Sequence, residues 1–316
     1  MKRWVIFALV VTAAWWIDPL LPNRAAAETV KDLEVGLSAG YRADELDWNI
    51  AGDINGENPN VLSDLTWEDL EIFQIKAKGE INVERKDFTY FTTYIRACVG
   101  YGWIVDGKNQ DSDYLGDNRA FEFSRSNNGS DDGDVLDASV GAGPQFRVMS
   151  DRLAIIPLVG YSYHEQNLTM TDGVQTIPNY GPFSGLDSTY ETQWDGPWLG
   201  IDLAFRPAEN FTLKGSFEYH WADYKGEANW NLRTDLAHPK SFEHDADGDG
   251  VVLSFGGDYA FTNHLSIHLN LDYQDWKTDD GIDKTFLADG TVLVTRFNEV
   301  NWESYAVMLG MTYRFF

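Results

Sequence analysis

Apolar and polar residues alternate with a period of two along one segment of this chain after another. From Phe211 to Trp221, the odd positions carry Phe, Leu, Gly, Phe, Tyr and Trp, and the even positions carry Thr, Lys, Ser, Glu and His. Successive side chains of a β-strand point to opposite faces, so such a segment predicts a strand with one apolar and one polar face. The same pattern recurs over about nine to eleven residues, the length of a tilted strand that crosses a bilayer, in segments 73–83, 197–205, 265–273 and 305–315.

The spacing of these segments predicts about ten strands. We place them at 33–50, 62–83, 88–105, 135–148, 153–170, 190–206, 211–229, 251–261, 265–277 and 300–316. The connections at 84–87, 149–152, 207–210 and 262–264 are short, whereas those at 51–61, 106–134, 171–189, 230–250 and 278–299 are long and rich in Gly, Asn and Asp. Short turns on one side and long loops on the other are typical of outer-membrane barrels, and an even strand count leaves both termini in the periplasm. The predicted fold is therefore all-β, a closed antiparallel transmembrane β-barrel; a soluble β-sandwich is the alternative.

The first 27 residues have the pattern of a secretory signal peptide. Lys2 and Arg3 precede the apolar run 4–16, and three alanines end at Ala27. A positive start, a short apolar run and small residues before the cleavage point define such a peptide, and the run is too short for a membrane helix. We therefore expect residues 28–316 to form one exported domain in the cell outer membrane, with outer-membrane lipids and the barrel-assembly machinery as partners.

The charge of the expected mature chain limits its partners. Removing residues 1–27 takes away three bases and one acid, which leaves 21 Lys and Arg against 49 Asp and Glu, a net charge of −28. Such a surface repels nucleic acid, so no nucleic-acid partner is expected. The acid excess suits a cationic peptide or another cationic surface ligand, or it simply keeps the loops solvated. Cys98 is the single cysteine, so no disulfide forms within the chain.

Several short motifs resemble the omptin family of outer-membrane proteases. They are Ser63-x-Leu65-x-Trp67 with the segment 75–82, Gly102-Trp103-Ile104-Val105-Asp106, Gly160-Tyr161, Pro197-Trp198-Leu199-Gly200 and Phe217-Glu218-Tyr219. The resemblance implies ten strands, five long outer loops and an endopeptidase site in which an Asp pair faces an Asp-His pair. In such chemistry a base activates a water and carboxylates orient it.

The resemblance assigns the catalytic residues only in part. Asp111-x-Asp113 keeps the spacing of the Asp pair, while Asp106 keeps its position in the motif. An ungapped match of the later strand places the family's Asp and His on Asn229 and Asn231, and Asn cannot take a proton from water near neutral pH. His244, between two acids, is the candidate replacement base, with His238 as a second choice.

The sequence also contains a candidate metal site and a charged lumen. Asp245-x-Asp247-x-Asp249-Gly250 resembles the first half of a calcium loop, but the acid expected at the twelfth position is replaced by Gly256. An acidic turn is the alternative, and no other cofactor is expected. The polar strand faces carry charges of both signs, which predicts paired charges that plug a narrow barrel.

Three functions therefore compete. The first is a non-proteolytic omptin-like barrel whose acidic loops bind a surface partner or serve as structure. The second is an active endopeptidase using Asp111, Asp113 and His238 or His244. The third is a narrow channel.

Overall fold

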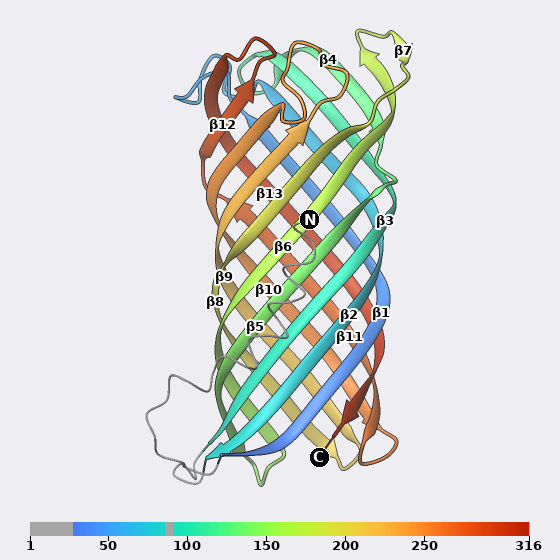
Figure 1. Ribbon diagram of the computed structural model, residues 1–316, viewed down its shortest axis with the longest axis vertical. Coiled ribbons are helices and arrows are strands. Elements are labelled where there is room, and N and C mark those ends of the chain that lie inside the picture. The colour runs from blue at the N-terminus through green and yellow to red at the C-terminus, as the bar shows by residue number, and fades with distance from the viewer. Residues whose placement is uncertain (1–27, 86–90, 316) are drawn as a thin grey trace.

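The computed structural model describes residues 28–85 and 91–315, and ten long strands form its wall (Figure 1). They are β1 (Glu28–Ile50), β2 (Ser63–Arg85), β3 (Thr92–Gly116), β5 (Gly133–Val148), β6 (Leu153–Ile177), β8 (Ser188–Ala208), β9 (Phe211–Asn229), β10 (Phe242–Ala260), β11 (Leu265–Thr278) and β13 (Val292–Arg314). β1 pairs with β2 on one side and with β13 on the other, both antiparallel, so the sheet closes on itself. The predicted barrel is confirmed. The predicted signal peptide lies outside the described residues.

Three short strands lie at the end of the barrel that carries the long connections. β4 (Ala120–Gly129) forms a hairpin with β3, β7 (Gly181–Pro182) pairs with β6, and β12 (Gly281–Phe286) lies between β10 and β13. The predicted loops 106–134, 171–189, 230–250 and 278–299 are therefore wrong over much of their length, because strands occupy large parts of them. The wall continues there beyond its apolar band, and outward side chains that meet water are polar, which weakens the alternation on which the prediction rested.

The lower part of the wall presents apolar side chains outward. On β8, Leu199, Ile201 and Leu203 are 37–49% exposed, whereas the inward-facing Trp198 is 1% exposed. Exposed Tyr and Trp side chains border this band toward the long connections, namely Tyr41, Trp103, Tyr161, Trp221 and Tyr305. An outward apolar band with an aromatic border is the surface that a bilayer covers. No helix in the described part of the chain is long and apolar enough to cross a membrane.

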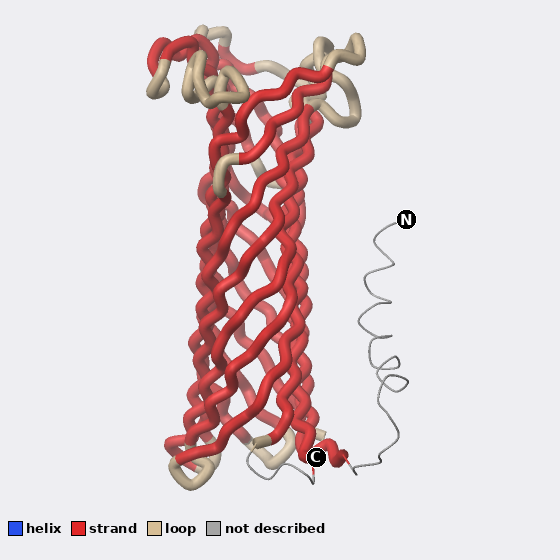
Figure 2. The backbone as a smooth tube through the Cα atoms, turned by 90° about the vertical axis from the view of Figure 1, so that its left-hand side faces the viewer, coloured by secondary structure: helices blue, strands red, loops and turns tan. Residues whose placement is uncertain are grey.

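Figure 2 shows that the barrel is elongated. Its interior has two parts, which differ in their side chains. Toward the long connections it is filled by a set of aromatic side chains that we call the aromatic plug: Trp48, Trp67, Tyr190, Trp194, Tyr224, Phe242, Trp276, Phe297 and Trp302. All five tryptophans of the plug are at most 2% exposed. Toward the short turns the interior is lined by charged and polar side chains. The short turns and the C-terminus lie together at the periplasmic end, and the long connections lie at the extracellular end (Figure 1).

Candidate functional site at the extracellular mouth

Asp111 and Asp113 lie on the part of β3 that rises above the apolar band. The pairing of β2 with β3 shifts its register on both sides of Glu71, just below this part of the strand. Above the shift, Asp111 accepts a hydrogen bond from the side chain of Trp230, and Arg233 acts electrostatically on both carboxyl groups. The predicted Asp pair therefore exists as a pair, and it faces the connection between β9 and β10.

The surroundings of the pair favour the protonated carboxyl groups. Burial, followed by the neighbouring charge of Asp113, raises the pKa of Asp111 to about 7. Burial also raises the pKa of Asp113, against hydrogen bonds from Ser63 and Ser124 that favour its anion. The positive charge of Arg233 acts in the opposite direction and lowers both pKa values, but without overcoming the effect of burial. The Arg233 guanidinium also forms a bidentate ion pair with Asp235 at 2.9 and 2.7 Å.

His244 lies elsewhere, inside the aromatic plug. Its Nδ1 is 2.8 Å from the hydroxyl of Tyr190, and its Nε2 is 3.3 Å from Oδ1 of Asp283. The rings of Trp48 and Phe297 lie 4.7 and 4.2 Å from the imidazole, centre to centre. The side chain is fully buried, and this burial lowers the pKa of His244, so the imidazole is neutral near pH 7.

Two aromatic rings connect the Asp pair to His244. Trp230, which contacts Asp111, lies 4.5 Å from the ring of Phe242, and Phe242 stacks at 5.3 Å on His244. Among the described residues, His244 has Tyr190 and Asp283 as its polar partners, with no hydrogen bond or ion pair to Asp111 or Asp113. The structure thus brings Asp111 and Asp113 together, whereas His244 pairs with Asp283 and not with either of them. The catalytic roles of these residues stay predictions.

Asn229 and Asn231 hold loops together. The side-chain oxygen of Asn229 lies 2.8 Å from Nδ1 of His238. Asn231 accepts hydrogen bonds from the backbone N–H of Asp187 and the hydroxyl of Ser188, both at 3.0 Å, and donates one to a backbone carbonyl. On β9 the buried side chains occupy even positions, so the inward residues at this level are Ala228 and Trp230. The ungapped match therefore lands on the outward face of the strand.

Asp245, Asp247 and Asp249 lie on the outward face of β10. Carboxylates two residues apart on a strand are separated by about 7 Å along the chain, whereas calcium ligands converge on one ion. In the described ranges, no group of three or more His, Cys, Asp and Glu side chains is arranged to hold a metal ion.

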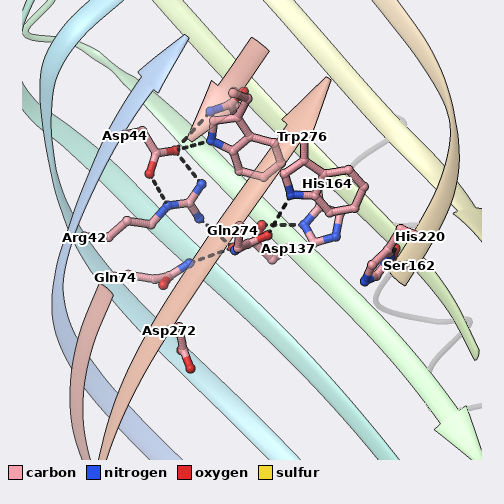
Figure 3. Close-up of polar contacts among 12 residues, drawn as sticks. Arg42, Asp44, Gln74, Asp137, Ser162, His164, His220, Asp272, Gln274 and Trp276 are labelled. Atoms are coloured by element: carbon pink, nitrogen blue, oxygen red, sulfur yellow. Dashed lines mark hydrogen bonds and ion pairs between the residues drawn. The ribbon is translucent and has the colours of Figure 1, made fainter. Parts of the chain in front are cut away.

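A network of buried charges crosses the barrel below the plug (Figure 3). Arg42 binds Asp44 through two nitrogens at 2.7 and 2.6 Å, and it binds Asp137 at 2.7 Å. Asp137 also accepts from Gln74 and contacts Nδ1 of His164, both at 2.8 Å. Each charge therefore has a partner, as a charge removed from water requires.

A second buried group lies lower in the lumen. Arg96 pairs with Glu218 at 2.7 Å and with Asp202 at 2.9 Å. Glu218 is 3.1 Å from Nε2 of His220, whose Nδ1 is 2.9 Å from Oγ of Ser162. These contacts have the order of a Ser-His-acid triad, but Ser162 and His220 are 2% and 1% exposed, so no substrate reaches the hydroxyl. The predicted paired charges in the lumen are confirmed.

The closed antiparallel wall, its outward apolar band and its paired luminal charges define an outer-membrane β-barrel protein. The chain belongs to the family described as Pom, Protochlamydia outer membrane protein, whose model matches residues 36–315. The barrel fold and the family membership both place the protein in the outer membrane.

Comparison with solved structures supports the omptin-like architecture. The outer membrane protease OmpT from Escherichia coli superimposes with a TM-score of 0.72 at 14% sequence identity, over 92% of this chain and 98% of OmpT. The NalP autotransporter translocator domain of Neisseria meningitidis gives a TM-score of 0.37 at 11% identity, over 99% of this chain and 96% of that one. The AIDA-I transport unit of E. coli gives 0.38 at 9% identity, over 97% and 96%. The likeness to OmpT shows a shared fold. No curated protein matches the sequence.

Proposed function

We propose that this chain is a non-proteolytic outer-membrane barrel of omptin-like architecture, whose acidic extracellular surface binds a cationic partner or serves as structure. The observation that carries this proposal is the position of His244. An omptin-type peptidase needs a base that reaches a water held by the Asp pair, and here Trp230 and Phe242 occupy the route between them.

The outward carboxylates support a binding role. Asp195, Asp223 and Asp247 are directly opposite one another on β8, β9 and β10. Like charges directly opposite in a sheet repel, and a bound cationic group relieves that repulsion. Asp195 accepts hydrogen bonds from Tyr161 and Gln193. Among the described residues, none of the three aspartates has an ion pair with Lys or Arg, so no cation of the chain neutralises this row of carboxylates.

Cleavage assays test the non-proteolytic part. The mature chain is refolded in detergent with lipopolysaccharide and incubated with fluorogenic peptides that contain basic residues. We expect no turnover above a protein-free blank. Turnover that Asp111→Ala abolishes, while the matched exposed variant Asp280→Ala retains it, would overturn the proposal.

Binding is tested separately with a fluorescent oligolysine peptide. We expect saturable, salt-sensitive binding that weakens in the triple variant Asp195→Asn, Asp223→Asn, Asp247→Asn. Binding that is unchanged in this variant would assign the row a purely structural role.

The interior argues against a channel. The aromatic plug and the Arg42 network fill the lumen at successive levels, so we expect silent planar bilayers after insertion. Regular conductance steps from the purified protein would instead favour the channel.

A further inference from the structure

The periplasmic half of the lumen contains a cavity of about 490 Å³. Its lining includes the short turns before β6, between β8 and β9, and between β10 and β11, so it reaches the periplasmic end of the barrel. Deeper in, its lining includes Lys76 and Asp202, the partners of Asp272 and Arg96 in the buried charged layers. We call this cavity the vestibule. The charged network and the aromatic plug lie above the vestibule and close it on the extracellular side. The vestibule therefore opens only toward the periplasm.

The charge of the vestibule differs from that of the rest of the protein. Eight Lys and Arg residues and seven Asp and Glu residues line it. The whole chain has 24 of the former against 50 of the latter. Outside the vestibule the acids thus outnumber the bases by more than two to one, and an anion that approaches this protein meets least repulsion here.

Most vestibule bases are already paired with an acid. Lys76 binds Asp272 at 2.8 Å, and Lys214 binds Asp258 at 2.8 Å. Such pairs hold the barrel wall and leave little net charge for a ligand.

Arg152 and Arg206 differ from the paired bases. The backbone N–H of Arg206 donates to the carbonyl of Arg152 at 2.7 Å, so the two residues are neighbours across the sheet. Both line the vestibule, and both side chains are exposed. In the described part of the chain neither guanidinium has a hydrogen-bond or ion-pair partner, although Asp151 and Glu209 lie in the same two turns. Arg147, on the adjacent strand β5, donates to the side-chain oxygen of Gln145 at 3.4 Å and lies 3.9 Å from Asp32.

We propose that the vestibule binds a small periplasmic anion, through a phosphate or carboxylate group held by Arg152 and Arg206. Two like charges side by side on a sheet repel, and a shared anion turns that repulsion into attraction. Guanidinium groups match the geometry of phosphate and carboxylate oxygens with paired N–H donors. Arg147, which lies opposite Ala154 on the adjacent strand, also lines the vestibule. This site is separate from the extracellular surface and does not depend on the function proposed for it.

Isothermal titration of the refolded mature protein in a neutral detergent at low ionic strength tests the site. Inorganic pyrophosphate and citrate are the probes, and they distinguish phosphate from carboxylate recognition. We expect saturable binding of at least one probe. Each of the single variants Arg152→Gln and Arg206→Gln is expected to weaken it by about tenfold or more, the loss of a charge-assisted hydrogen bond.

The matched control is Lys277→Gln, which removes an exposed base at the extracellular end of β11 and is expected to leave the affinity unchanged. Heat-modifiable migration on gels checks that every variant is folded. The proposal is overturned if neither probe binds saturably, if the double variant Arg152→Gln, Arg206→Gln binds as well as the parent, or if Lys277→Gln loses binding to the same degree.

Discussion

Replacing Asp111 by Asn tests how the extracellular mouth is built. The carboxyl group of Asp111 lies beside Asp113 in a partly buried site, and its pKa rises from 3.8 to about 7. The amide of Asn keeps the shape and a hydrogen-bond acceptor for Trp230 but carries no charge. We therefore expect Asp111→Asn to stabilise the folded barrel near neutral pH.

The size of the effect follows from the pKa. A carboxyl group that holds its proton more tightly when folded lowers the free energy of unfolding as the pH rises through the interval between the unfolded and folded pKa values. Here that interval runs from about pH 4 to about pH 7 and spans roughly three units, each worth about 1.4 kcal/mol. Asp111→Asn should therefore raise the free energy of unfolding by at most about 4 kcal/mol at pH 8 and by almost nothing at pH 4.

Urea unfolding of the refolded protein, followed by tryptophan fluorescence, measures this difference at pH 4, 6 and 8. Asp280→Asn is the control, because Asp280 is exposed at the same end of the barrel. A variant Asp111→Asn that is no more stable than the parent at pH 8, or that gains the same stability at pH 4 and pH 8, would show that the carboxyl group is not destabilised by ionisation in the folded state.

Three further perturbations address the interior and the acidic strand. Trp302 is 1% exposed, stacks on the indole of Trp276 and donates to Asp44 at 3.0 Å. Trp302→Ala should therefore lower the free energy of unfolding by about 3–5 kcal/mol. An unchanged urea midpoint would contradict this packing. Asp137→Ala removes a shared partner of Arg42 and His164 and should cost about 3–5 kcal/mol, with Asp137→Asn less harmful; equal losses in the two variants would show that the charge is unimportant. Chelation by EDTA should leave the melting temperature unchanged, and a fall that calcium reverses would assign the segment 245–249 to calcium binding.

The wall of the barrel could be predicted from sequence because the bilayer imposes a simple rule. Where lipid surrounds the strand, as at Leu199, Ile201 and Leu203, outward residues are apolar, and the inward residues between them, Gly200 and Asp202, are small or polar. Above the bilayer this rule inverts. On β10, Phe242 and His244 point inward into the plug, and acids point outward into water. In the sequence, the acid-rich segment 242–250 resembles a loop, because its outward acids hide the alternation with the inward residues.

The candidate site was predictable on one side only. The spacing of Asp111 and Asp113 places both on the same face of β3, and the structure keeps them together. The side of the site opposite the Asp pair is formed by the upper end of β9, and its composition depends on which face of that strand points inward. A shift of one residue exchanges the two faces. Asn229 and Asn231 therefore fall on the outside. The pairing of His244 with Asp283 depends on β12, which has only six residues and was hidden inside a predicted loop.

We propose that this chain keeps an omptin-like barrel without the peptidase chemistry. The most direct test is the initial rate of cleavage of a basic fluorogenic peptide by the refolded mature protein with lipopolysaccharide at pH 7. We predict a rate equal to that of the protein-free blank, with Asp111→Ala indistinguishable from the parent. Robust cleavage by the parent that disappears in Asp111→Ala would show instead that the barrel is an active peptidase.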